Sequence, residues 1–133
     1  TLPRMAEAAE LRGDSGLVLF GGAGGAFALE EYRRGSVGTM PGSTLPDMFV
    51  RTWDLWQEGN EKGAEKEFHR YAALIRTLGQ GQGVANWIYK HIMWRRGIFK
   101  KASTYARHPA LPASKQDLKE VDQLLEELDL VGT

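Results

Sequence analysis

A strand–helix–strand pattern punctuated by glycine spans residues 17–43 and constrains the fold more than any other stretch of the chain. A short apolar run over residues 17–20 stops at residues 21–25, which read Gly-Gly-Ala-Gly-Gly. A helical segment over residues 26–34 follows, and then a second extended run over residues 36–40. Apolar runs of this length bounded by turn residues predict strands that are buried on both faces. Because one helix joins them, the two strands are expected to be parallel neighbours.

The carboxyl ends of these two strands are where a ligand is expected. In open and closed α/β folds, ligands meet the carboxyl ends of parallel strands. Here those ends are residues 20–25 and residues 40–43, which contain several glycines. Residues without large side chains let the backbone approach a ligand closely.

The glycine-rich turn does not fit a dinucleotide-binding loop. Gly22 and Gly24 supply the first half of the motif G-x-G-x-x-G, but position 27 is phenylalanine. The third glycine of that motif lets the helix pack closely on the strand, and Phe27 would block this packing. No P-loop lysine follows the turn either. NAD or FAD binding is therefore not expected, and no cofactor is predicted.

Outside this unit the sequence predicts helices and one irregular connection. The expected helices cover residues 1–13, 44–58, 60–78, 84–96 and 114–128, with Ser43 or Thr44, Asn60 and Ser114 as N-caps, and residues 98–113 form the connection. A two-stranded parallel sheet has no stability of its own, because both its faces and both its edges need cover. The pattern therefore predicts an α/β fold that is the end of a larger (β/α)8 barrel, followed by a helical tail. A complete barrel has about 250 residues, so about half of one is expected upstream of Thr1.

Charge and composition argue against several classes of partner. Acidic and basic residues balance at 17 each, whereas a nucleic-acid-binding protein needs concentrated positive charge. The lack of cysteine excludes disulfides and thiolate metal sites and fits a reducing cytoplasm. No apolar run approaches the ~20 residues of a membrane span, and the first residues do not resemble a signal peptide. His69, His91 and His108 have no metal-ligand spacing, so no metal site is predicted.

The chain carries no recognisable catalytic group at the strand ends. No Ser/His/Asp set, carboxylate pair or thiol stands there. A Schiff-base lysine would need a desolvated pocket at a strand end, where its pKa would be lowered. The lysines lie instead in the helical tail or its connections: Lys62, Lys66, Lys90, Lys100, Lys101, Lys115 and Lys119. No catalytic residue is therefore predicted within this chain.

The order of these pieces resembles the C-terminal half of the dihydrodipicolinate synthase/N-acetylneuraminate lyase family. The resemblance covers nearly the whole chain and rests on residues 18–22, residues 34–41, Pro46-Asp47, Gly59, Ala64, Lys90, Arg96-Gly97, Arg107-His108-Pro109 and the last leucine-rich helix. It implies the last two strands of a (β/α)8 TIM barrel and their helices over residues 1–58. A three-helix C-terminal extension would follow over residues 59–133. It also implies a cytoplasmic enzyme that assembles as a homotetramer.

The same resemblance implies a Schiff-base mechanism, in which a lysine condenses with pyruvate or another 2-keto acid. That lysine belongs to the sixth strand and is expected a few residues upstream of Thr1. This chain alone would then be inactive and would need the missing N-terminal half of the barrel. The substrate-binding residues that the resemblance implies here are Gly22 on strand seven and Thr39 and Met40 on strand eight.

The chain departs from the lysine-biosynthetic members of the family at two places. Those members tend to carry a carboxylate where Ala23 stands and an asparagine near residues 41–43. The differences favour a dehydratase or aldolase that acts on a 2-keto-3-deoxy sugar acid. Two alternatives stay open: dihydrodipicolinate synthase itself, and a non-catalytic helical interaction module.

Overall fold

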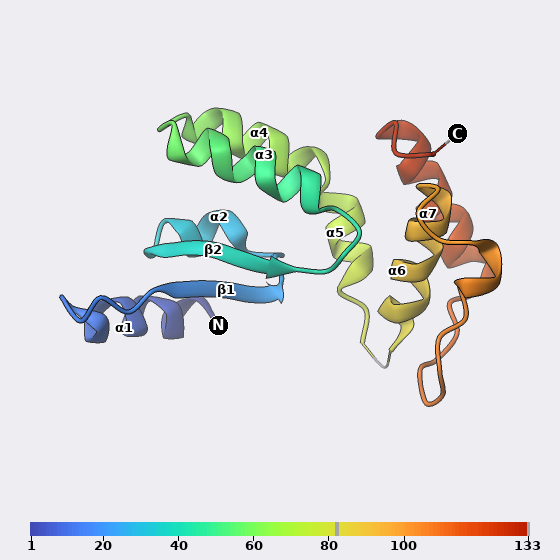
Figure 1. Cartoon of the computed structure of the whole chain (residues 1–133), viewed down its shortest axis with the longest axis horizontal. Coiled ribbons are helices and arrows are strands. Elements are labelled where there is room, and N and C mark those ends of the chain that lie inside the picture. Colours follow the sequence, from blue (N-terminus) through green and yellow to red (C-terminus); the bar gives the residue numbers. More distant parts are fainter. Residues whose placement is uncertain (82, 133) are drawn as a thin grey trace. The chain divides into compact units, whose positions relative to one another are not determined.

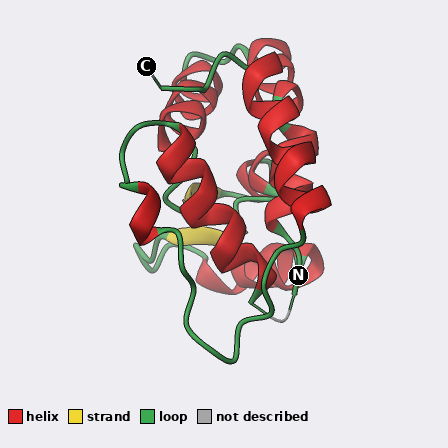
Figure 2. Cartoon of the chain, turned by 90° about the vertical axis from the view of Figure 1, so that its right-hand side faces the viewer, coloured by secondary structure: helices red, strands yellow, loops and turns green. Residues whose placement is uncertain are grey.

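The computed structural model describes residues 1–81 and 83–132, which form two compact units, Thr1–Arg70 and Tyr71–Thr133. Helices make up most of the described chain (Figure 1), and Figure 2 shows how little of it is strand. None of the helices described combines the length and the apolar character that crossing a bilayer requires. The predicted boundary between barrel and extension, at residues 58 and 59, stays a prediction. Gln82 and Thr133, within the predicted extension, lie outside the described residues.

The first unit is built on a two-stranded parallel sheet. Its elements are β1 (Leu19–Gly24), α2 (Ala28–Tyr32) and β2 (Ser36–Pro41). Gly21 pairs with Thr39 and Gly24 pairs with Pro41, so the carboxyl ends of the two strands lie side by side. The predicted strand–helix–strand pattern, its parallel pairing and the α/β class are therefore confirmed.

β1 lies further along the chain than the sequence predicted. It begins at Leu19 and runs through the glycines, whereas Leu17 and Val18 precede it and are 66% and 63% exposed. Phe20, inside the strand, is 53% exposed, so the expectation of a strand buried on both faces is wrong for this chain. The physical reason is that the helices in contact with the sheet leave the face that carries Phe20 uncovered.

Longer helices complete the first unit. They are α1 (Leu2–Arg12), α3 (Pro46–Gln57) and α4 (Glu61–Arg70). α1 packs against β1 and α3 packs against β2, and α3 and α4 lie side by side (Figure 1). The small core of this unit includes Leu29 of α2, Leu45 and Met48 at the start of α3, and Ala64 and Phe68 of α4.

The start of α3 differs from the prediction by one or two residues. Leu45 occupies the N-cap position without a side-chain hydrogen bond, where Ser43 or Thr44 was expected. Pro46 explains the shift, because its fixed φ and missing N–H suit the first position of a helix. Asn60 acts as predicted, since its Oδ1 accepts a hydrogen bond from an N–H in the first turn of α4 at 3.0 Å.

The single helix predicted over residues 60–78 is two helices, α4 and α5 (Ala72–Leu78). Tyr71 separates them, with φ −101° and ψ 3°, and occupies the N-cap position of α5. Its side chain is buried (2% exposed) and so continues the apolar stripe of the sequence across the break. Periodicity could not locate this break, because the stripe persists through it.

The second unit is helical. Its elements are α5, α6 (Val84–Arg95), the 3₁₀ helix η1 (Lys101–Ser103) and α7 (Lys115–Glu127). Its buried side chains include Leu74, Ile88, Ile92, Val121 and Leu125. The predicted cap of the last helix is confirmed as a capping box: Oγ of Ser114 accepts from the N–H of Asp117 at 3.1 Å, and Oδ2 of Asp117 accepts from the N–H of Ser114 at 2.7 Å.

Candidate functional site

The carboxyl end of the sheet brings together the residues that the sequence singled out. Thr39 on β2 is the partner of Gly21 on β1, and Gly22 and Met40 are the next residues along each strand. The register shifts on both sides of the Gly21–Thr39 pair. Bulges of this kind are over-represented beside active sites, because they change the direction in which side chains point.

Gly22 presents open space at this end of the sheet. A Cβ built on Gly22 would meet nothing within 4 Å. Its main chain is already engaged, because its N–H donates to Oε1 of Glu31 at 3.4 Å and its carbonyl accepts from the N–H of Gly25 at 2.9 Å. Gly22 therefore offers room for a small ligand on a backbone that is held in place.

Gly21 and Gly22 face opposite sides of the sheet. A Cβ on Gly21 would lie 1.8 Å from Oε2 of Glu31, so Gly21 faces α2. The partner of Gly21, Thr39, points the same way, since its Oγ1 is buried and it lines a hollow formed with α2 and α3. Met40 is 64% exposed and, by the alternation of a strand, lies on the side of Gly22. The structure thus brings Gly22 and Met40 onto one open face, where Thr39 can contribute only its main chain.

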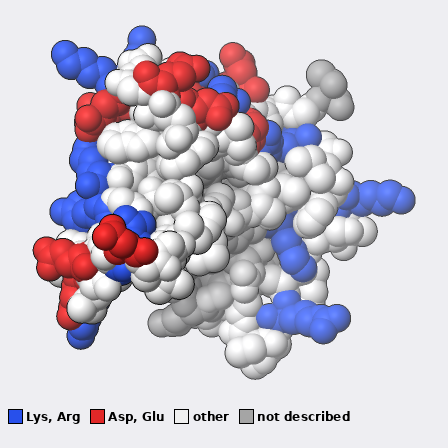
Figure 3. Space-filling model, turned by 60° about the vertical axis from the view of Figure 1, so that its left-hand side comes forward, with Lys and Arg blue, Asp and Glu red and all other residues white. Residues whose placement is uncertain are grey.

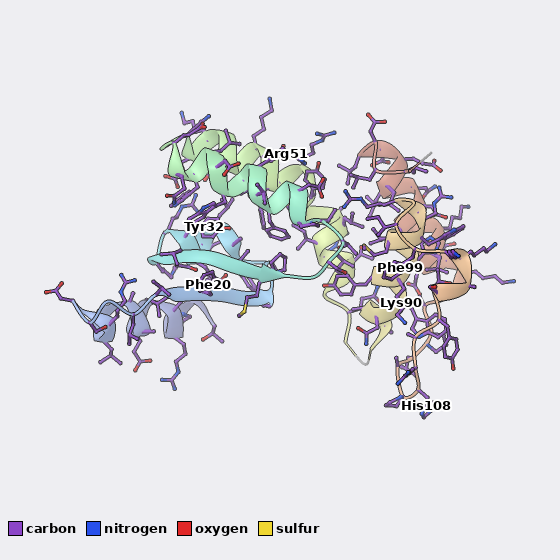
Figure 4. All side chains as sticks on the ribbon, in the orientation of Figure 1. Phe20, Tyr32, Arg51, Lys90, Phe99 and His108 are labelled. Carbon is purple, nitrogen blue, oxygen red and sulfur yellow. The ribbon has the colours of Figure 1, made fainter. Side chains whose placement is uncertain are left out.

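The hollow on the helix-facing side of β2 has a volume of about 250 Å³. Besides Thr39 it is lined by Tyr32 of α2 and by Phe49 and Trp53 of α3. Tyr32 lies between the sheet and α3 (Figure 4) and meets Trp53 edge to face, with 4.8 Å between ring centroids. Burial raises the pKa of Tyr32 to about 12, with a smaller contribution from the charge of Glu31. These aromatic side chains pack on the side of β2 that faces α2 and α3.

Glu31 is the residue at this site that the sequence did not identify. Its carboxyl is buried (8% exposed) between α2 and β1, and Oε2 has no hydrogen-bond partner among the described residues. Burial raises the pKa of Glu31, the hydrogen bond from Gly22 lowers it in part, and the charge of Glu30 raises it. The available signal was helical spacing, because Glu31 lies three residues after the buried Ala28.

The histidines and lysines lie away from the sheet in sequence, as expected. His69 is exposed on α4, His91 is buried on α6 with Nε2 2.7 Å from Oδ1 of Asp122, and His108 lies in the loop after η1 (Figure 4). Lys90 donates from Nζ to the carbonyl of Tyr105 at 2.5 Å. Within residues 1–81 and 83–132, no three His, Asp or Glu side chains gather in a way that could hold a metal ion.

Charges of both signs are interspersed on the surface. Figure 3 shows lysine and arginine beside aspartate and glutamate around a broad uncharged face. In the first unit, Arg33 on the end of α2 pairs with Glu61 at 2.6 Å and with Glu65 of α4, and Arg51 pairs with Glu67 at 2.7 Å. These exposed pairs join helices and contribute little to a binding site.

Comparison with solved structures finds close matches to one kind of enzyme. Over 95% of its length the chain matches dihydrodipicolinate synthase from Rhodopseudomonas palustris, with 32% sequence identity and a TM-score of 0.83. Dihydrodipicolinate synthases from Aquifex aeolicus and Bacillus clausii match 100% and 98% of the chain, each at 18% identity, with TM-scores of 0.81 and 0.83. The chain spans only 43–44% of the length of these proteins. No protein-family model matches the chain, and no curated protein does.

Proposed function

The chain corresponds to the C-terminal part of a dihydrodipicolinate synthase-type (β/α)8 barrel, and on this premise we propose that it is part of a Schiff-base-forming lyase for pyruvate-type 2-keto acids. In this proposal β1 and β2 are the seventh and eighth strands of the barrel. The reactive lysine belongs to the portion of the barrel that this chain does not cover. The complete enzyme is a homo-oligomer of the cytoplasm, assembled as a tetramer.

The chemistry of the proposal places the covalent step on that lysine. Its amine condenses with the carbonyl of the keto acid, which releases water and forms an imine. The imine accepts the electron pair of the C–C bond that an aldolase breaks, or of the adjacent C–H bond that a dehydratase deprotonates; in the second case the resulting enamine expels the hydroxyl group, which leaves with the C–O electron pair and is protonated to water. One difficult step thus becomes two easier ones. The present chain supplies the wall of the pocket, formed by the strand ends at Gly22, Thr39 and Met40.

The observation that supports this role is the open side of Gly22. The residue stands at the carboxyl end of a strand, where barrel enzymes bind their substrates. No side chain of the described residues comes within 4 Å of a Cβ placed there. A small keto acid needs such a place, free of side chains and next to a rigid backbone.

The preferred substrate class is a 2-keto-3-deoxy sugar acid, which an aldolase would cleave or a dehydratase would dehydrate. Ala23 is exposed at the strand end with φ +50° and offers no carboxylate to a substrate. The second candidate is dihydrodipicolinate synthase itself, which the 32% identity to the Rhodopseudomonas palustris enzyme favours.

The first experiment tests the chain alone. It is incubated with pyruvate and borohydride, which reduces any imine to a stable amine, and the product is measured by intact mass. We expect no adduct, because none of its lysines stands at a strand end. A covalent adduct on any lysine of this chain overturns the proposal.

The second experiment supplies the missing portion. The chain is joined to the N-terminal portion of the Rhodopseudomonas palustris synthase, the part outside the 43% match, to form what we term the completed barrel. With pyruvate and borohydride, the completed barrel should gain one adduct on a lysine of the added portion. If circular dichroism shows that the completed barrel is folded but no adduct forms, the result contradicts the proposal. The parent synthase is the matched control for substrate class, because only the completed barrel should act on a 2-keto-3-deoxy sugar acid.

A further inference from the structure

A buried carboxyl group contacts the end of β1 on the side that faces α2. Glu31 reaches from α2 to the underside of the strand, where its Oε1 accepts the hydrogen bond of Gly22. Its Oε2 occupies the space of the absent side chain of Gly21, 1.8 Å from where a Cβ would be. A side chain larger than hydrogen at position 21 would exclude the carboxyl. The glycine and the glutamate are thus complementary in shape.

We propose that Glu31 is a positioning residue for the keto-acid pocket, which fixes the main chain of Gly21 and Gly22 so that the open side of Gly22 faces the substrate. The proposal deepens the function proposed above and rests on it. Glu31 does not touch the substrate in this proposal, because its side chain is buried and its carboxyl occupies the space beside Gly21.

The irregular pairing of the strands explains why such support is needed. The register shifts between the Gly21–Thr39 pair and the Gly24–Pro41 pair. A residue in a bulge lacks its regular ladder bonds, and a buried N–H without a partner is costly. The side chain of Glu31 supplies the partner for Gly22, and the N–H of Gly25 closes the turn onto the carbonyl of Gly22 at 2.9 Å. These two hydrogen bonds engage both the N–H and the carbonyl of Gly22.

A second buried polar group without a partner among the described residues lies on the same side of the strand pair. Burial raises the pKa of Glu31, and a protonated carboxyl can donate through Oε2 while Oε1 still accepts from Gly22. Oγ1 of Thr39 is also buried without a partner among the described residues, and Thr39 is paired with Gly21. Two buried oxygens without a hydrogen-bond partner among the described residues, Oε2 of Glu31 and Oγ1 of Thr39, thus lie on the same side of the strand pair.

The test compares two replacements of equal length in the completed barrel. E31Q keeps an uncharged group that accepts from Gly22, whereas E31M keeps the shape of the side chain but removes the acceptor. E30Q is the matched control, because Glu30 is the adjacent carboxylate on α2 and neither of the two hydrogen bonds of Gly22 described above involves it. Two quantities are measured: the pyruvate concentration for half-maximal adduct formation, and the hydrogen exchange of the peptide that contains Gly22.

We expect E31Q and E30Q to stay within about threefold of the parent in both quantities. E31M should raise the half-maximal pyruvate concentration about tenfold and speed exchange at Gly22 about tenfold, because that N–H loses its partner. E31M with unchanged exchange and unchanged pyruvate dependence overturns the assignment of Glu31. The absence of any adduct in the parent completed barrel overturns the proposed function instead, and the exchange measurement still decides whether Glu31 anchors Gly22.

Discussion

The carboxyl group of Glu31 occupies the place where a side chain on Gly21 would be, since a Cβ on Gly21 would lie 1.8 Å from Oε2 of Glu31. Gly21 has no left-handed φ, so the backbone itself does not demand glycine there. Glycine is required there because the carboxyl of Glu31 fills the space that a side chain would need. The two residues therefore constrain each other, although they are separated by a turn and most of a helix.

Replacement of Gly21 by alanine is expected to destabilise the protein. The added methyl group must displace the buried carboxyl, and overpacking of this kind costs about 1–3 kcal/mol. The double variant G21A/E31A should recover at least half of the loss, because the shorter side chain leaves the space free. Urea denaturation of the four proteins of this cycle, each as the completed barrel, measures the coupling. Strictly additive effects would contradict the steric relationship.

Replacement of Gly22 by alanine is expected to act on binding and not on stability. Gly22 also lacks a positive φ, and its Cβ would meet nothing within 4 Å, so the free energy of unfolding should change by less than about 0.5 kcal/mol. The same methyl group would project into the space proposed for the keto acid. Adduct formation with pyruvate should therefore require about tenfold more pyruvate. G22A with normal pyruvate dependence would show that the substrate lies elsewhere.

The parallel strand–helix–strand unit was predictable because glycines and apolar runs mark it directly in the sequence. The cap at Ser114 was predictable for a similar reason, since capping depends on residues only three positions apart. The start of β1 was not, because exposed Leu17 and Val18 have the same apolar character as strand residues. An apolar residue is buried only where another element of the fold packs over it, and the local sequence does not show where that is.

The candidate site was predictable in its location but not in its construction. Glycines at a strand end indicated where a ligand could approach. The role of Glu31 depends on the pairing of α2 with β1, and a carboxylate in a short helix has no signature of its own. Which of Thr39 and Met40 faces the open side depends on the register shift beside Gly21, and no local pattern encodes that shift.

The stability of the completed barrel should fall with rising pH through the titration of Glu31. Burial raises the pKa of Glu31 above 4.5, the hydrogen bond from Gly22 and the Thr1 amino group lower it in this chain, and Glu30 raises it. Arg4 of α1 lines the same hollow as Glu31 and Gly22. Between the unfolded pKa and the raised folded pKa, the folded protein binds more protons, so the free energy of unfolding decreases as pH rises.

E31Q cannot ionise and should escape that loss. Urea midpoints of the parent and of E31Q, measured from acid to mildly alkaline pH, should agree closely at low pH. They should then separate in favour of E31Q above the folded pKa. E30Q should keep a fall of the same sign but a smaller one, because loss of the Glu30 charge lowers the raised pKa of Glu31. Parallel curves for the parent and E31Q would mean that Glu31 titrates normally.

The stability of the first turn of α7 should change with pH in the opposite direction, through the titration of Asp117. The hydrogen bonds from the side chain and the backbone of Ser114 lower the pKa of Asp117 below 3.8. Its contribution is therefore complete above that value and is lost as pH falls through the lowered pKa. The replacement D117N removes the charge beside the positive end of the helix dipole and should cost about 0.5–1 kcal/mol at neutral pH.

Hydrogen exchange in the first turn of α7, compared between parent and D117N at each pH, measures this local loss. The ratio of rates should be largest at neutral pH and should approach one in acid, because the parent carboxyl is then also uncharged. E120Q is the control, since Glu120 lies on the same helix and its Oε1 accepts a hydrogen bond from the side chain of Gln116 at 2.8 Å. A ratio that does not change with pH would mean that Asp117 caps the helix without its charge, so that shape and hydrogen bonding alone hold the turn.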